Sequence, residues 1–198
     1  MNSLEREELT TKTETEAERE NPMREIRIEK VTVNIAVGKS GDPLEKAKKV
    51  LQQITEHTPC QRNAKRTVKD WGIRKGEPIA CIVTLRGEEC ESFLKRAIEA
   101  VGNKIPESSF DDYGNFSFGI KEHIDIPGTK YVPEIGIFGM NVNVTLERRG
   151  YRIKRRAMRT SQIGKKHVIS KQEAMGFSAS KLQANIVREG VTSGETEA

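Results

Sequence analysis

Few residues in this chain have the type and spacing that catalysis needs. The three histidines are scattered and show no HxxxH or HExxH spacing, and the phosphate-binding loop motif GxxxxGK[ST] is absent. His57 and Cys60 are three residues apart across the expected end of a helix, and they are the single candidate nucleophile–base pair. Adjacent acids such as Asp111 and Asp112 usually form turns. We therefore predict no catalytic residue, no metal site and no cofactor, and we favour a binding protein.

Cations are the residues whose density is unusual. Residues 148–166 hold nine Lys or Arg and no acid. Like charges at this density repel one another unless an anion is supplied, and Arg is suited to bidentate contact with phosphate. We interpret the run as a nucleic-acid contact, the alternative being a solvated tail. The predicted contact residues in it are Arg148, Arg149, Arg152, Arg155 and Arg156.

A second basic stretch surrounds Trp71, the only tryptophan. Between residues 62 and 75 it holds a single acid, Asp70; Gly72 interrupts it and Gly76 follows it. A basic, glycine-punctuated loop that carries an aromatic side chain is a common RNA-contacting element. Alternatively, Trp71 anchors the base of the loop by being buried. The cations predicted to make contacts are Lys65, Arg66, Lys69, Arg74 and Lys75.

The charge balance of the whole chain also favours a polyanionic partner. The formal net charge is +5, although residues 1–22 hold seven Glu against three cations and residues 188–198 hold three Glu against one Arg. The part between them is therefore more basic than the total suggests, which is typical of nucleic-acid binding; the alternative is a basic protein without such a partner. Three cysteines without CxxC spacing indicate a reducing compartment. No apolar run is long enough to cross a membrane, so we expect a cytoplasmic protein with no membrane partner.

Strands with one polar face are expected to position the contact residues. In REIRIEKVTVNIAVG (24–38), apolar β-branched residues alternate with polar ones, which predicts a strand with one face in a core. Residues 79–86 and 140–147 repeat the pattern. The other face carries hydrogen-bonding groups, which suits a polar, anionic partner. The polar-face residues predicted to make contacts are Thr32, Asn34, Thr84 and Arg86.

The remaining pattern predicts an α+β fold. Asp42 is the expected N-cap of a helix over 42–57, with Pro43 at its first position. A second helix is expected over 88–101, and a capping box at Ser170–Glu173 predicts a short last helix. Further strands are expected near 62–68, at 115–120 and at 134–138. The predicted fold is a mostly antiparallel sheet of four to five strands with helices on one face and a concave RNA-binding face on the other.

Composition divides the chain into three parts. Residues 1–22 are rich in Glu and Thr with almost no apolar side chains, and we predict a disordered acidic tail. Residues 23–175 form the predicted single α+β domain, which includes the basic segment 148–166. Residues 176–198 are predicted to be a partly disordered C-terminal extension.

Five motifs, in order, resemble one protein family. They are VTVNIAVG (31–38), NAKRTV (63–68), IRKGEPIACIVTLRG (73–87), SFDDYGNFSFGIKEHI (109–124) and GMNVNVTL (139–146). They are similar to the universal 5S-rRNA-binding proteins of the large ribosomal subunit, the "ribosomal protein five" family in its archaeal form. The similarity covers about residues 23–175.

The resemblance implies a function for each contact surface. It implies a five-stranded antiparallel sheet with helices on its convex side and a concave face that holds 5S rRNA, which anchors that RNA in the central protuberance. By motif, the sheet-face contacts correspond to Asn34, Thr84 and Arg86, with His57 at the end of the first helix, where the family commonly has Gln. The basic loop 65–75 corresponds to one that approaches the peptidyl-site tRNA. The loop before Met140 corresponds to a contact with a protein of the small-subunit head. Large-subunit rRNA and other large-subunit proteins are the remaining implied partners.

Two other functions stay open at this point. An RNA-modifying enzyme is one, with His57 and Cys60 as its catalytic pair. A DNA-binding module is the other, although no predicted helix carries a surface rich in Arg and Asn. We predict first a structural RNA-binding protein of the ribosome. In it, Thr and Asn side chains read sugar edges and 2′-hydroxyls while Arg and Lys neutralise phosphates.

Overall fold

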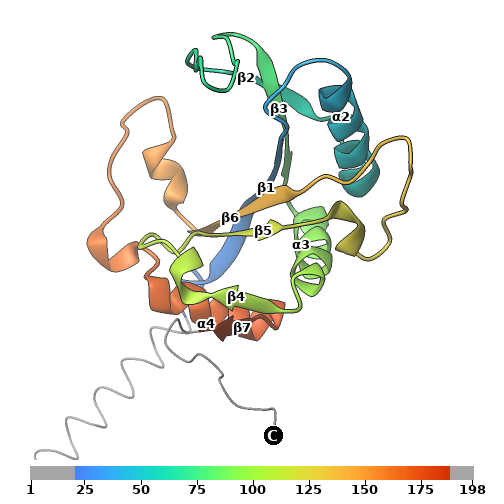
Figure 1. Cartoon of the computed structure of the whole chain (residues 1–198). Helices are drawn as coiled ribbons and strands as arrows, with labels where there is room; N and C mark the ends of the chain where they lie inside the picture. Colours follow the sequence, from blue (N-terminus) through green and yellow to red (C-terminus); the bar gives the residue numbers. More distant parts are fainter. Residues whose placement is uncertain (1–20, 188–198) are drawn as a thin grey trace, which may run out of the picture.

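The computed structural model describes residues 21–187. Almost all of the tail predicted over 1–22, and the end of the extension predicted over 176–198, lie outside the described residues. Five strands form an antiparallel sheet in the order β2–β3–β1–β6–β5 (Figure 1), which confirms the predicted α+β class. The strands are β1 (Ile26–Ala36), β2 (Cys60–Asn63), β3 (Pro78–Leu85), β5 (Phe116–Ile120) and β6 (Met140–Arg148).

Two amphipathic helices cover one face of the sheet. They are α2 (Asp42–Thr55) and α3 (Glu88–Ala100), and both lie on the same side of the sheet in Figure 1. Their apolar stripes bury side chains such as Leu51 and Leu94 in the same core as the inward-facing Val33 of β1, and all three are fully buried. Burial of this apolar surface, at about 25 cal/mol per Å², is the main stabilising contribution.

The start of α2 differs from the prediction. Gly41, not Asp42, is the N-cap, with a φ of 93°, and Asp42 lies in the first turn. The Gly41 carbonyl accepts the N–H groups of Leu44 and Glu45 at 3.0 and 3.3 Å. Asp42 therefore acts through its charge near the positive end of the helix rather than through a side-chain cap.

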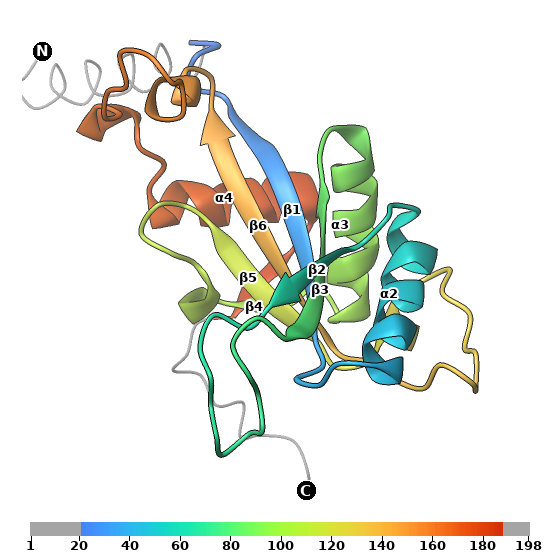
Figure 2. The ribbon, with the colours of Figure 1, turned by 90° about the horizontal axis from the view of Figure 1, so that it is seen from above.

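The last helix extends beyond the predicted domain boundary at residue 175. It is α4 (Lys171–Leu182), and it begins with the predicted capping box, in which both Ser170–Glu173 hydrogen bonds are formed. After it, β7 (Asn185–Val187) pairs in parallel with β4 (Lys104–Pro106). Figure 2 shows α4 and the two short strands beside the main sheet. Ser178 and Leu182 are buried, so residues 176–187 continue the same core.

Two of the strand predictions are wrong: one strand begins and ends earlier in the chain, and the other does not form. The strand predicted near 62–68 ends at Asn63, because the chain then forms a long hairpin loop with a single bridge between Val68 and Ile73. Residues 134–138 form no strand. Gly136 has a φ of 87°, and the Ile135 N–H donates to the Val132 carbonyl in a turn.

The segment 121–139 is held to the core at its two ends. The Phe138 N–H donates to Nδ1 of His123 at 3.2 Å. His123 is buried, and this burial lowers its pKa. Ile126 packs into the core with 1% of its surface exposed. The rest of the segment loops past the end of α2 (Figure 1).

Candidate nucleic-acid interface

The face of the sheet opposite α2 and α3, here called the open face, carries rows of hydrogen-bonding side chains. Val31, Val33 and Ile35 point into the core, so the pleat turns Thr32 and Asn34 to the open face. In the strand register, Thr32 lies between Thr84 of β3 and Asn143 of β6. Paired residues of antiparallel strands share a face. The structure therefore brings together the predicted contact residues Thr32, Asn34 and Thr84.

Sequence reasoning left the β6 and β5 part of this face out of the contact set. Asn141 and Asn143 are exposed and pair with Asn34 and Thr32. Ser117 of β5 continues the row beyond Asn143. The signal that could have found these residues is the alternation of Met140, Val142, Val144 and Leu146, because it turns the asparagines to the face opposite the core.

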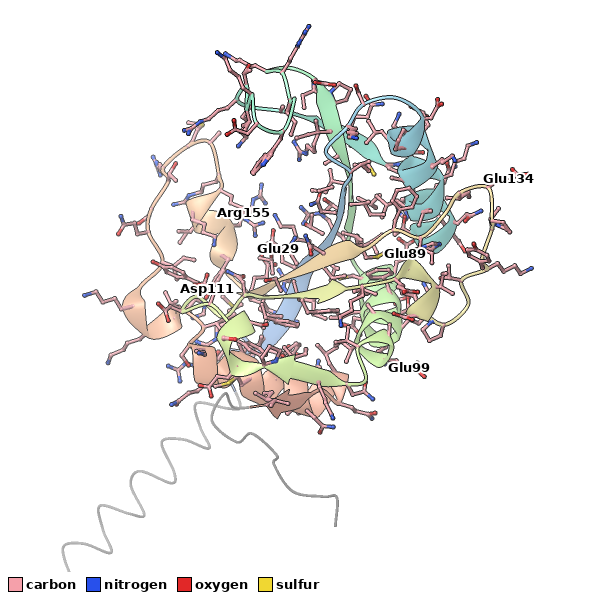
Figure 3. The ribbon with its side chains drawn as sticks, in the orientation of Figure 1. Glu29, Glu89, Glu99, Asp111, Glu134 and Arg155 are labelled. Carbon is pink, nitrogen blue, oxygen red and sulfur yellow. The ribbon has the colours of Figure 1, made fainter. Side chains whose placement is uncertain are left out.

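One end of the open face carries a network of two carboxylates and three guanidinium groups. The side chains of Glu29 and Glu147 are only 7% and 9% exposed. Arg27 Nε donates to Glu147 at 3.0 Å, and Arg86 Nη1 lies 3.6 Å from Glu29. Arg155 contacts both acids and points from the basic segment toward Glu29 (Figure 3). Sequence reasoning identified Arg86 and Arg155 and missed both acids.

Arg155 therefore ties the basic segment to the sheet. Partial burial lowers its pKa, but the charge of Glu29 and the hydrogen bond to Glu147 outweigh this effect, and the net pKa is raised. The guanidinium is always charged in any case. Two ion pairs to nearly buried carboxylates hold residues 151–155 against β1 and β6, where Figure 1 shows this part of the chain facing the sheet.

The other arginines of the basic segment divide into exposed and internal residues. Arg149, Arg152 and Arg156 are exposed, and Arg149 lies 3.9 Å from Glu25. Arg148 is buried: its guanidinium donates to Glu173 at 2.6 Å and to the His167 carbonyl at 3.4 Å. The structure thus places Arg148 inside the protein, away from the open face.

The second basic stretch forms the hairpin loop between β2 and β3, residues 64–77. Hydrogen bonds from Ala64 N–H to Glu77 and from Gly76 N–H to Ala64 close its base at 2.8 and 2.9 Å. Trp71 is 74% exposed, so it does not anchor the loop by burial. All five cations predicted to make contacts there, Lys65, Arg66, Lys69, Arg74 and Lys75, are exposed.

His57 and Cys60 have separate partners. His57 Nδ1 lies 2.8 Å from the Thr55 carbonyl, and its Nε2 lies 3.3 Å from Glu89 of α3. His57 is thus placed beside the helices and not with Asn34 on the open face. The Cys60 thiol faces the Gln61 carbonyl at 3.5 Å. Burial raises the pKa of Cys81 and of Cys90 to about 11, which makes both thiols poor nucleophiles.

Two further properties concern residues 21–187. Within this range, no three His, Cys, Asp or Glu side chains are grouped as they would be around a metal ion. None of the helices there is long and apolar enough to cross a membrane.

The fold and this surface define a class: an α+β protein with an open polar sheet face, a tethered basic segment and a basic hairpin loop. Two family models match the chain. One, described as "Ribosomal protein L5", matches residues 21–74, and the other, which describes the C-terminus of the same ribosomal protein family, matches residues 78–177. The chain belongs to the ribosomal protein L5 family.

Curated relatives support the same assignment over nearly their whole length. The chain is 52% identical to a protein from Nitrosopumilus maritimus over 80% of this chain and 91% of the relative. It is 53% identical to one from Sulfurisphaera tokodaii over 84% and 95%, respectively. It is 47% identical to one from Methanobrevibacter smithii over 85% and 99%. All three are named "Large ribosomal subunit protein uL5".

Family membership confirms several predictions made from sequence. The resemblance to the archaeal form of the family is confirmed. The protein is a structural constituent of the large ribosomal subunit, acts in the cytoplasm as part of translation, and is not an enzyme. The alternative of an RNA-modifying enzyme is thereby set aside.

Proposed function

We propose that this protein binds 5S rRNA through the open face of its sheet and anchors that RNA in the central protuberance of the large subunit. The observation that carries the proposal is the row of neutral hydrogen-bonding side chains across β3, β1, β6 and β5, in which Thr84, Thr32, Asn143 and Ser117 are neighbours. A rigid, open row of this kind matches the shallow minor groove of RNA, where 2′-hydroxyls and base edges are displayed.

Cations on both sides of this row add the sequence-independent part of the binding. Arg86 is 59% exposed at the end of β3, and Arg149, Arg152 and Arg156 are exposed on the basic segment. Contacts with phosphate position the RNA, while the neutral side chains contribute the selectivity. Other parts of the large-subunit rRNA and neighbouring large-subunit proteins are further partners in this proposal.

Two loops are proposed to contact partners outside the 5S rRNA. The hairpin loop 64–77 extends from the edge of the sheet (Figure 2) and exposes five cations around Trp71, which suits the backbone of the peptidyl-site tRNA. The segment 121–139, which precedes Met140, is proposed to face a protein of the small-subunit head. Its exposed Tyr131 and Ile137, each 53% exposed, suit a protein partner.

The test is equilibrium binding of the full-length protein to 5S rRNA, to tRNA and to duplex DNA of equal length across a salt series. The double variant Asn34→Ala with Arg86→Ala is expected to weaken 5S rRNA binding about tenfold or more, because each lost hydrogen bond to the ligand is worth roughly 1 kcal/mol. The matched control, Lys46→Ala with Gln53→Ala, removes the same two kinds of group from the exposed surface of α2 and leaves binding unchanged.

Selective binding of 5S rRNA that survives moderate salt supports the proposal. Equal affinity for the three nucleic acids, lost steeply as salt rises, would show only a basic surface and would overturn it.

A further inference from the structure

A hollow of about 490 Å³ lies between the basic segment and the sheet, and the function proposed above assigns no ligand to it. One side of it is formed by Tyr113 and Asn115, which precede β5, and by Thr145 of β6. The other side is formed by residues 151–168, which include Tyr151, Lys154 and Gln162. The hollow therefore opens beside the row of hydrogen-bonding side chains.

The walls of the hollow are fixed by the packing beneath them. The Tyr151 hydroxyl donates to the His167 carbonyl at 3.0 Å and accepts the Ile169 N–H at 3.1 Å, and Tyr151 is 5% exposed. Gly114 has a φ of 79°, and a Cβ there would lie 2.6 Å from Ile169 Cγ2. These contacts lock the two sides of the hollow together, so it is formed before any ligand arrives.

The lining combines aromatic and apolar surface with unused hydrogen-bonding groups. Tyr113 is 67% exposed, and Ile163 and Val168 add apolar surface. Within residues 21–187, the side chains of Asn115, Thr145 and Gln162 make no hydrogen bond. Lys154 lies at the same site with its Nζ 5.0 Å from the centre of the Tyr151 ring. A ligand that fits has a flat aromatic face, an edge with donors and acceptors, and a negative charge.

We infer that this hollow receives one unstacked base of the bound RNA. The Tyr113 ring stacks on the base, the amides of Asn115 and Gln162 bond its edge, and Lys154 contacts its phosphate. Sequence-specific recognition of RNA commonly uses bases splayed out of loops in this way. The inference rests on the proposed function, since it assigns the neighbouring open face to the RNA.

The first test measures binding of the full-length protein to a set of 5S rRNAs, each carrying one abasic site at a loop nucleotide. One abasic RNA is expected to bind the wild-type protein roughly five- to a hundredfold more weakly, because a base stacked on an aromatic ring contributes about 1–3 kcal/mol. In the variant Asn115→Leu with Gln162→Leu, intact RNA binds more weakly, and the same abasic site weakens binding by a smaller factor than it does for the wild type, because only the stacking on Tyr113 remains to be lost. Non-additivity of this kind identifies a direct contact.

Two further variants are tested, one as a control outside the hollow and one that removes the stacking ring. Gln53→Leu with Gln172→Leu removes two exposed amides from α2 and α4, outside the hollow, and is expected to behave as wild type. Tyr113→Ser removes the stacking surface at an exposed position, so it leaves the fold intact and shows the same loss as the amide variant. None of these changes alters the net charge, so the salt dependence of binding stays that of the wild type.

A second probe separates the hollow from the 5S rRNA assignment. It is a short RNA hairpin with 2-aminopurine in its loop, whose fluorescence falls when the base stacks. Quenching by the wild type, and not by Tyr113→Ser, supports the inference. It does so even if the protein binds 5S rRNA no more tightly than tRNA, because that result would overturn only the proposed function. The inference would be overturned if, for every abasic RNA, the losses of affinity caused by the abasic site and by the protein variant were additive, and if the wild type and Tyr113→Ser quenched equally. Selective binding of 5S rRNA would then still support the proposed function.

Discussion

Neighbouring arginines of the basic segment have different functions, and the difference depends on which way each side chain points. Arg148 is the last residue of β6 and continues the inward alternation of Val144 and Leu146, so its side chain enters the protein. Arg149, one residue later, is exposed. Charge density alone assigns both residues to RNA. The alternation of β6, continued to its last residue, instead assigns Arg148 to the interior and Arg149 to the surface.

At Arg148 the structure predicts a charge-dependent stability. Its side chain is 5% exposed, Glu173 is its carboxylate partner, and its Nε has no hydrogen-bond partner among the described residues. Glu173→Gln keeps a side chain that can complete the capping box but removes the negative charge that faces the guanidinium, which keeps its bond to the His167 carbonyl. Arg148 is buried but the Glu173 side chain is 44% exposed, so solvent screens part of the interaction and we expect a loss of about 1–2 kcal/mol in unfolding free energy. Chemical denaturation at pH 7 measures this loss.

The same pair predicts the pH dependence. Partial burial raises the pKa of Glu173, but the Ser170 N–H and Arg148 outweigh this effect, so the pKa lies below its usual 4.5. A lowered carboxyl pKa gives stability that is complete above the unfolded-state pKa and is lost as pH falls through the folded-state pKa. The gap between wild type and Glu173→Gln should therefore narrow below about pH 4.5. Glu45→Gln, which breaks a surface pair with Lys48, should cost under about 1 kcal/mol; equal costs would contradict the assignment.

At the scale of elements, periodicity predicted the parts of the fold that bury one face. Alternation located β1, β3 and β6, and helical spacing located α2 and α3, because in each case one face packs into the core. β2 was placed wrongly because its four residues are polar and exposed, so that only its pairing with β3 defines it. EIGIF (134–138) alternates like a strand, but Gly136 reverses the chain there.

The connection before β5 is predicted to depend on Gly114. Its positive φ already disfavours a side chain, and an added Cβ would overlap Ile169. Gly114→Ala is therefore expected to lower the unfolding free energy by about 3 kcal/mol, from backbone strain plus overpacking. Gly72→Ala is the matched control, since φ is 67° but nothing lies within 4 Å, and it should cost about 1 kcal/mol. Equal losses on denaturation would show that the contact with Ile169 is unimportant.

At the scale of the whole molecule, the polar surface is assembled from segments that lie far apart in the chain. Glu29 and Arg155 are separated by 126 positions, and they meet because β1 and β6 are neighbours in the sheet. No local pattern contains that pairing. Sequence reasoning therefore found the cations and the strand faces but not the acids that join them.

The ion pairs of Arg155 are predicted to hold the basic segment in place over the sheet. Arg155→Gln leaves two nearly buried carboxylates with one fewer donor each, so we expect a loss of about 1–2 kcal/mol in unfolding free energy. Hydrogen exchange of residues 150–163, followed by mass spectrometry, should become several-fold faster, because local opening no longer breaks these ion pairs.

Arg156→Gln is the matched control, because it removes the same charge one residue later. Its Nε donates only to the Arg159 carbonyl at 2.8 Å, and the residue is exposed. The unfolding free energy should therefore stay within about 0.5 kcal/mol of the wild-type value, and the exchange rate of residues 150–163 should not change. If the two variants exchanged alike, the ion pairs could not be what positions the segment. The order of the hollow beneath it would then have to come from Tyr151 and its bonds to His167 and Ile169 alone.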